Sequence, residues 1–383
     1  MNRQTTGKKS LRCGFTTGAA AAAAGVAAYC HFTKGRMPKA IDLLFPDGQS
    51  QRIQTTLTAQ GEAQVIKDAG DDPDVTDKAK IRALFSPVTL AMAEEHDYLI
   101  DVGLGKIILH GGPGVGLCGR IGLDCEKNKW AINQVPRLMI AENLARAGFG
   151  GQKECGLLTI SVVEGQKLAQ KTLNAQLGIT NGISILGTSG IVYPYSHKAY
   201  IKTIEILVKA VAITGFDQVI FTTGGRTLKA ATACLPEIES TAFIRIGDFI
   251  YESLQAARIQ GISRAVVACM PGKLCKYAAG YRNTHAANVS QTLVPLAKIV
   301  KEFSLDQNLA QEILGCNSVR QALTLIPDIF YAASLRQLAG QALLTMKNWT
   351  PNLPLRLLIF DYEGNLLIDE LGSDAGCARD LLS

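Results

Sequence analysis

The chain has 383 residues, of which 47% are hydrophobic and 19% are charged. This composition supports a sizeable core and excludes bulk disorder and a fibrous protein, while the length favours two domains. The net charge of +6 comes without a dense basic block, which suits a small anionic ligand. Aromatic residues make up only 6%, so we expect no nucleic-acid partner.

The first predicted element is an alanine-rich helix at about residues 18–31. Thr16, Thr17 and Gly18 stand directly before the alanines, where N-cap residues belong. Basic residues before an apolar run also imitate a secretory signal, but alanine is a weak hydrophobe and the best helix former. We therefore favour the capped helix. No other stretch has the 18 or so apolar residues of a membrane span, so we expect no membrane partner.

The rest of the first half reads as mixed α+β. A hairpin is predicted at residues 40–57, around the turn Pro46-Asp47-Gly48. Residues 67–77 form an acidic loop with five aspartates, which repel one another unless something pairs with them. This loop is either simply solvated, or it supplies a general base, a cation site or contacts to a ligand. Residues 103–122 then contain eight glycines, a composition that lets the backbone approach a ligand closely.

The second half alternates apolar strand, glycine-rich loop and helix, which is typical of βαβ units around a parallel sheet. We expect a two-domain α+β and α/β protein. Residues 1–178 would form the α+β domain, with the alanine-rich helix, the aspartate-rich loop and the glycine-rich loop. Residues 179–383 would form a Rossmann-like domain with a mostly parallel sheet, closed by a C-terminal hairpin.

Three predicted strand ends carry small or hydroxyl residues, and ligands of open α/β sheets bind beyond such ends. These loops are Gly187-Thr188-Ser189-Gly190, Thr222-Thr223-Gly224-Gly225 and Met270-Pro271-Gly272-Lys273. Any one of them could be an ordinary turn, but the three together favour a nucleotide-like ligand. Glycines 114, 116 and 119 also match a dinucleotide fingerprint. No helix opens at the third glycine, so a nicotinamide oxidoreductase is disfavoured.

The sequence contains few candidates for metal ligands, nucleophiles or acid–base residues. The ten cysteines include no Cys-x-x-Cys pair and no two histidines have ligand spacing, so we expect no protein-bound metal. Free thiols suit a reducing compartment, and we expect a cytoplasmic protein. No P-loop and no nucleophile elbow is present. His285 follows a strand–loop–helix unit and is the most suggestive histidine, although a lone histidine is more often structural.

Several segments together resemble the CbiD family, the cobalt-precorrin-5B C1-methyltransferases of anaerobic cobalamin synthesis. These segments are Arg12 to Gly18, Val65 to Thr76, Ala131 to Arg137, Gly182 to Val192, and Gly272 to Gly280 with Asn283-Thr284-His285. They occur in the family order over residues 12–285. The aspartate-rich segment and the Gly182 segment are the most specific.

The resemblance implies that a methyl group passes from S-adenosylmethionine to C1 of a cobalt-containing tetrapyrrole, giving cobalt-precorrin-6A. Cobalt enters only as part of the substrate. The residues expected at the donor are Gly187, Thr188, Ser189, Gly190, Thr223 and Gly224; those at the substrate are Thr16, Thr17, Asp68, Asp71, Arg137 and Lys273; and His285 or Asp72 would handle a proton.

Loops at 117–123, 222–227 and 270–271 differ from the usual family pattern. They motivate a second hypothesis, a non-catalytic corrinoid- or tetrapyrrole-binding protein of the same pathway. The oligomeric state is left open, a homo-oligomer included.

Overall fold

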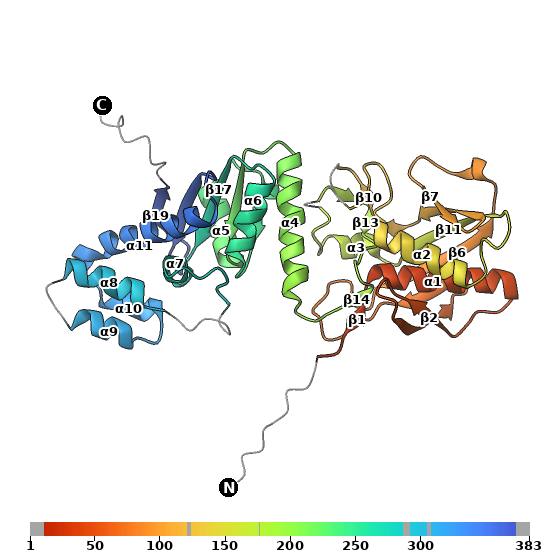
Figure 1. The fold of residues 1–383 in the computed structure, drawn as a ribbon, viewed down its shortest axis with the longest axis horizontal. Coiled ribbons are helices and arrows are strands. Elements are labelled where there is room, and N and C mark those ends of the chain that lie inside the picture. The colour runs from red at the N-terminus through yellow and green to blue at the C-terminus, as the bar shows by residue number, and fades with distance from the viewer. Residues whose placement is uncertain (1–10, 121–123, 176, 286–291, 305–307, 373–383) are drawn as a thin grey trace, which may run out of the picture. The chain divides into compact units, whose positions relative to one another are not determined.

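A computed structural model of the chain describes residues 11–120, 124–175, 177–285, 292–304 and 308–372. It divides into two compact units, unit 1 (Met1–Ser196) and unit 2 (His197–Ser383). Each unit has its own sheet and helices (Figure 1). The division falls later than the boundary expected between residues 178 and 179, so the segment 179–196 lies in unit 1.

Pairing of short strands explains the later boundary. The strands are β12 (Ile179–Thr180), β13 (Gly182–Ile183) and β14 (Ile191–Val192), and their partners are β10 (Leu117–Cys118), β9 (Gly114–Val115) and β1 (Gly14–Phe15). All three partners belong to unit 1. The loop between β13 and β14, which holds Gly187 and Gly190, is therefore bound to unit 1 and not to the parallel sheet of unit 2.

Unit 1 is built on a six-stranded mixed sheet. Its strands, in spatial order, are β4 (Thr56–Leu57), β5 (Ala63–Ile66), β6 (Lys80–Pro87), β11 (Cys155–Val162), β8 (Gly105–Gly111) and β7 (Tyr98–Val102). Only β11 and β8 run parallel. The predicted hairpin forms separately as β2 (Ala40–Leu44) and β3 (Ser50–Gln54).

The alanine-rich segment is the buried central helix of unit 1. Helix α1 (Thr17–Lys34) begins after the N-cap Thr16, whose Oγ1 accepts a hydrogen bond from the Ala19 amide at 3.2 Å. Every residue from Thr17 to Tyr29 is buried. Alanine is small enough to let α2 (Gln134–Arg146) and the sheet approach the helix from different sides.

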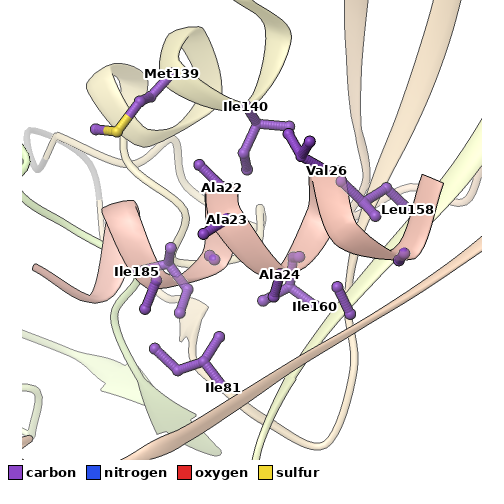
Figure 2. Close-up of a cluster of buried hydrophobic side chains, with 14 of the residues drawn as sticks. Ala22, Ala23, Ala24, Val26, Ile81, Met139, Ile140, Leu158, Ile160 and Ile185 are labelled. Carbon is purple, nitrogen blue, oxygen red and sulfur yellow. The ribbon is translucent and has the colours of Figure 1, made fainter. Parts of the chain in front are cut away.

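Figure 2 shows this packing, in which side chains from α2 and from the sheet surround the alanines. The labelled neighbours are Ile81, Met139, Ile140, Leu158, Ile160 and Ile185. The capped helix expected from the sequence is therefore confirmed, and its alanines serve close packing in the core.

Unit 2 is built on a five-stranded sheet. Its strands, in spatial order, are β16 (Phe243–Arg245), β15 (Gln218–Thr222), β17 (Arg264–Cys269), β18 (Leu355–Phe360) and β19 (Leu366–Leu371). The first four run parallel, and β19 adds an antiparallel edge. The expected C-terminal hairpin is thus confirmed as β18 and β19.

One helix, α4 (His197–Ile213), precedes these strands in the chain, and the helices after it connect them. These connecting helices are α5 (Gly225–Cys234), α6 (Ile250–Ile259), α7 (Pro271–Ala278), α8 (Val294–Phe303), α9 (Leu309–Gly315), α10 (Val319–Leu325) and α11 (Asp328–Trp349). Unit 1 adds the short α3 (Gly165–Ala169). Over the described ranges, no helix combines the length and apolar character needed to cross a membrane.

Candidate functional site

In unit 1, the segment just before α1 lies between the aspartate-rich loop and the loop after β13. The Phe15 amide donates to the carbonyl of Asp68 at 2.8 Å, and the Asp71 amide donates to the carbonyl of Arg12 at 2.9 Å. On the other side, the Thr16 amide donates to the carbonyl of Gly190 at 2.8 Å. The structure therefore brings three sequence motifs together that are far apart in the chain.

The five aspartates of the acidic loop all accept hydrogen bonds from the chain itself. Asp68 binds the Arg12 guanidinium, Asp71 the Arg12 amide (2.7 Å), Asp72 the Tyr195 amide (2.9 Å), Asp74 the Lys67 ammonium (2.6 Å) and Asp77 the Ala69 amide (2.9 Å). The repulsion expected from the sequence is thus relieved internally. These hydrogen bonds order the loop.

Two of these carboxylates have lowered pKa values. The hydrogen bond from Arg12 outweighs burial and lowers the pKa of Asp68 to about 2. At Asp74, burial alone would raise the pKa, but the ammonium of Lys67 and hydrogen bonds from Thr76 together lower it. Lys67 is only 1% exposed, so Asp74 is the counter-ion of a buried side chain.

The loop after β13 packs against the start of α1. Gly187 has φ +133°, and a Cβ there would stand 2.5 Å from the side chain of Thr16. Thr17 Oγ1 accepts from the Leu186 amide at 2.9 Å and donates to the Ser184 carbonyl at 3.1 Å. Ser189 Oγ accepts from the Ile191 amide at 3.2 Å, and Thr188 is exposed. Strand β14 follows this loop, so it is not the strand-to-helix turn that the sequence suggested.

Arg137 occupies another part of unit 1. Its guanidinium lies 3.8 Å from the ring centroid of Tyr98, and its Nη1 lies 3.3 Å from Glu126 Oε1. Its Nε is buried, with no hydrogen-bond partner among the residues that the structure describes. Burial raises the pKa of Tyr98 to about 12, so this ring faces the cation as a neutral phenol.

A buried carboxylate that the sequence did not single out lies next to Tyr98. The side chain of Asp97 is 1% exposed. Its Oδ1 lies 2.8 Å from His110 Nδ1 and accepts from Trp130 Nε1 at 3.1 Å. Asp97 thus holds both rings beside the glycine-rich segment that starts at Gly111. No local motif marks this contact, because its three residues come from different strands and loops.

In unit 2, the order of the strands marks one position at the carboxyl edge of the sheet. The chain leaves β15 through α5 toward β16, on one side. It leaves β17 through α7 toward β18, on the other side. Connections diverge between β15 and β17, and in open α/β sheets ligands bind at such a switch point.

The residues at this switch point leave the backbone accessible. Thr223 and Gly224 follow β15, and the Gly224 amide donates to Thr227 Oγ1 at 2.9 Å in the first turn of α5. Among the described residues, a Cβ at Gly224 or at Gly272 would meet no atom within 4 Å. Both strand ends therefore offer open space next to bare backbone, as a closely bound ligand requires.

Three polar side chains join beside this position. Lys273, in the first turn of α7, forms an ion pair with Oδ1 of Asp248 and donates to Thr284 Oγ1 at 2.7 Å. Thr284 Oγ1 also donates to Asp248 Oδ1, at 2.9 Å. Burial alone would raise the pKa of Asp248, but the bonds from Lys273 and Thr284 lower it. Asp248 was not singled out from the sequence.

His285 lies next to this cluster. Its ring centroid is 5.7 Å from that of His197, the first residue of α4, and its amide donates to Asn283 Oδ1 at 2.9 Å. The charge of His285 contributes to the lowered pKa of Asp248. Among the described parts of the chain, no group of three or more histidines, cysteines and acids could hold a metal ion.

The predicted site residues thus fall into three groups. Unit 1 brings together Thr16, Thr17, Asp68, Asp71, Asp72 and the loop 187–190, and it places Arg137 elsewhere, beside Tyr98; unit 2 brings together Thr223, Gly224, Lys273 and His285. The six residues expected at the donor are therefore divided between the two units.

Comparison with known proteins shows one family along most of the chain. The CbiD family model matches residues 4–194, and the model of the CbiD C-terminal domain matches residues 283–370. A protein of Polaromonas sp. (strain JS666 / ATCC BAA-500), named cobalt-precorrin-5B C(1)-methyltransferase, is 36% identical over 376 residues, with 94% of this chain and 98% of the relative covered. A protein of Methylococcus capsulatus with the same name is also 36% identical, with coverages of 96% and 95%.

One solved structure is also similar. It is the crystal structure of the cobalamin biosynthesis protein (cbiD) from Archaeoglobus fulgidus. Its sequence is 27% identical, and the match covers 71% of this chain and 81% of that chain with a TM-score of 0.38.

Proposed function

The chain belongs to the CbiD family, and on that premise we propose that it is a cobalt-precorrin-5B C(1)-methyltransferase. It transfers a methyl group to C1 of cobalt-precorrin-5B in cobalamin biosynthesis, and S-adenosylmethionine is the donor. The observation that carries this proposal is the match to named methyltransferases over more than nine-tenths of both sequences. A match confined to one unit would not support a complete activity.

The reaction requires little chemistry from side chains. The donor supplies a methyl group on a sulfonium. A bond forms between ring carbon C1 and the methyl carbon, while the sulfur–methyl bond breaks and its electron pair stays on sulfur. The protein must align these atoms, and alignment alone can lower a barrier by up to ~7–11 kcal/mol. This fits a chain in which neither the sequence nor the described structure presents a catalytic triad.

We place the donor at the carboxyl edge of unit 2, and we regard this unit as Rossmann-like. Thr223 and Gly224 lie at the switch point, and bare backbone faces open space there and at Gly272. These residues fit an adenosyl ligand, because backbone amides at the start of α5 can hold its carboxylate. His285, beside the same cluster, remains our candidate for handling a proton.

We place contacts to the substrate carboxylates in unit 1. Arg12 is 57% exposed at its side chain while Asp68 and Asp71 bind its guanidinium and its amide. We therefore propose that these two aspartates act on the substrate by orienting Arg12. Thr16, Thr17 and the loop 187–190 lie beside this segment and Arg137 offers a second cation. Asp72 holds Tyr195 just before unit 2 begins, and its role in proton transfer remains a proposal.

The test is an anaerobic incubation of the full chain with S-adenosylmethionine and cobalt-precorrin-5B, followed by mass spectrometry. We expect the tetrapyrrole to gain the mass of one methyl group and the donor to become S-adenosylhomocysteine. A non-catalytic carrier would bind the tetrapyrrole and leave its mass unchanged, which would overturn the proposal.

A further inference from the structure

Asp248 holds a position at the donor edge that the proposed function has not used. It follows β16, while Lys273 follows β17, and these two strands flank β15 on either side. Their ion pair therefore spans the carboxyl end of β15, where Thr223 and Gly224 begin. A ligand that rests on the loop after β15 must lie against this ion pair.

Among the described residues, the hydrogen bonds to the side chain of Asp248 are all on one carboxylate oxygen. Oδ1 takes the ion pair with Lys273 and the hydrogen bond from Thr284. Oδ2 has no hydrogen-bond partner within the described ranges, and the side chain is 24% exposed. One oxygen is thus held in place by the protein, and the other is an acceptor open to a ligand.

The surrounding residues keep this carboxylate in one orientation. Thr284 is 1% exposed, its amide donates to the carbonyl of Asp248 at 3.1 Å, and its own carbonyl accepts from Lys276 Nζ at 2.8 Å. Thr284 is therefore bonded through its amide, its hydroxyl and its carbonyl. A functional carboxylate supported in this way loses little entropy when a ligand binds.

The chemistry of an open carboxylate oxygen at this place points to hydroxyl groups. An ionised carboxylate only accepts hydrogen bonds, so its partner must donate. In nucleotide-binding α/β sheets, an acidic residue about 20 residues past the first glycine-rich turn accepts from a ribose hydroxyl. Asp248 follows the second strand of unit 2, after the turn at Gly224, and it has that relation to the fold.

We propose that Asp248 binds the ribose hydroxyls of the methyl donor through Oδ2, with Lys273 and Thr284 as positioning residues. This inference rests on the proposed function, because it assumes an adenosyl donor at the switch point. It also changes the role of Lys273, which the sequence placed at the substrate. Its ammonium already holds Asp248 and Thr284, so a substrate carboxylate would have to displace them.

The test compares two ligands by calorimetry on the full chain. One is S-adenosylhomocysteine, and the other is its 2′,3′-dideoxy analogue, which lacks both ribose hydroxyls. For Asp248→Ala we expect roughly tenfold or greater loss of affinity for the first ligand, as for a lost hydrogen bond to a charge. We expect a change of less than about twofold for the analogue. Equal losses for both ligands, or no loss for either, would overturn the inference.

A second variant addresses folding. Thr284→Val keeps the shape of the side chain and removes the hydroxyl that orients Asp248. We expect it to lower the affinity for S-adenosylhomocysteine by about threefold and to leave the affinity for the analogue unchanged. If Thr284 had a purely structural role, the affinities for both ligands would fall together. Asp42→Ala, at an exposed ion pair of unit 1, is the control and should change neither affinity.

The wild type separates the two proposals. If it binds neither ligand, with or without cobalt-precorrin-5B, the donor site of the proposed function fails. If it binds both ligands and Asp248→Ala leaves their ratio unchanged, only the assignment of Asp248 is wrong.

Discussion

The aspartate-rich loop of unit 1 and the carboxyl edge of unit 2 use polar residues in opposite ways. In the loop, five carboxylates accept hydrogen bonds from the chain, and a buried lysine lies beneath them. At the edge, glycines face open space and one oxygen of Asp248 has no partner in the described structure. The conspicuous motif therefore stabilises the protein, while the plainer edge keeps atoms available for a ligand.

This difference teaches where to look for function in such a sequence. A dense cluster of like charges is costly unless the fold neutralises it, so its partners are found inside the fold. A binding edge instead needs backbone without side chains and a few well-supported polar atoms. Four substitutions test whether the two regions differ in this way.

The largest effect is expected for Asp74→Ala. It leaves the ammonium of Lys67 buried without its carboxylate partner, which costs about 3–5 kcal/mol when a buried ion pair is broken. Urea unfolding followed by circular dichroism would show the lower midpoint. The matched control is Asp42→Ala, whose partner Arg52 is 68% exposed. The free energy of unfolding of this variant should change by less than about 0.5 kcal/mol. Similar midpoints for the two variants would contradict a structural role for the loop.

The next effect is expected for Gly187→Ala. The glycine has φ +133°, and the added methyl would stand 2.5 Å from Thr16. We expect the free energy of unfolding to fall by about 1–3 kcal/mol, because the backbone is strained and the helix cap is displaced. Thermal unfolding of the variant and the wild type measures this directly. An unchanged Tm would show that this loop can move away from α1.

A smaller, pH-dependent effect is expected for Arg12→Met. In the wild type, Arg12 lowers the pKa of Asp68 from 3.8 to about 2. A lowered folded-state pKa stabilises the fold above pH 3.8, and that stability is lost as the pH falls toward 2. The variant should therefore have the lower Tm at neutral pH, and the difference should shrink as the pH falls through about 2. A difference that persists at pH 2 would point to lost packing rather than lost charge.

The smallest effect on stability is expected for Gly224→Ala. Its φ of 179° is extended, and no atom of the described residues lies within 4 Å of the added methyl, so the Tm should hold or rise slightly. The methyl would, however, occupy the space that we assign to the donor. Affinity for S-adenosylhomocysteine, measured by calorimetry, should fall by roughly tenfold. Unchanged affinity would move the donor away from this loop.

Much of the fold could be predicted because its signals are local. The cap at Thr16, the hairpin turn at Pro46 to Gly48 and the alternating strands of unit 2 each depend on residues close in sequence. The boundary between the units falls later than expected because it depends on two-residue strands whose partners lie more than 60 residues earlier in the chain. Such short pairings leave no periodic pattern to read.

The candidate site was less predictable for the same reason. Lys273 and Thr223 stand in glycine-rich turns after buried strands, and this local pattern made both of them candidates, Lys273 for the substrate and Thr223 for the donor. Asp248 stands in an ordinary turn, and its importance comes from the order of β16, β15 and β17, which places it opposite Lys273. The sequence around Gly187 resembles a strand-to-helix turn. In the structure, the strand β14 follows this loop and pairs with β1.

The central position of α1 has a consequence for synthesis of the chain. The helix leaves the ribosome well before the strand β11 that helps to bury it, because α1 ends at Lys34 and β11 ends only at Val162. At about 5–20 residues per second, the helix waits on the order of ten seconds for this partner. A segment of leucines would be prone to aggregate in that interval, whereas alanines expose little apolar surface. The same small side chains that permit close packing therefore also protect the nascent protein.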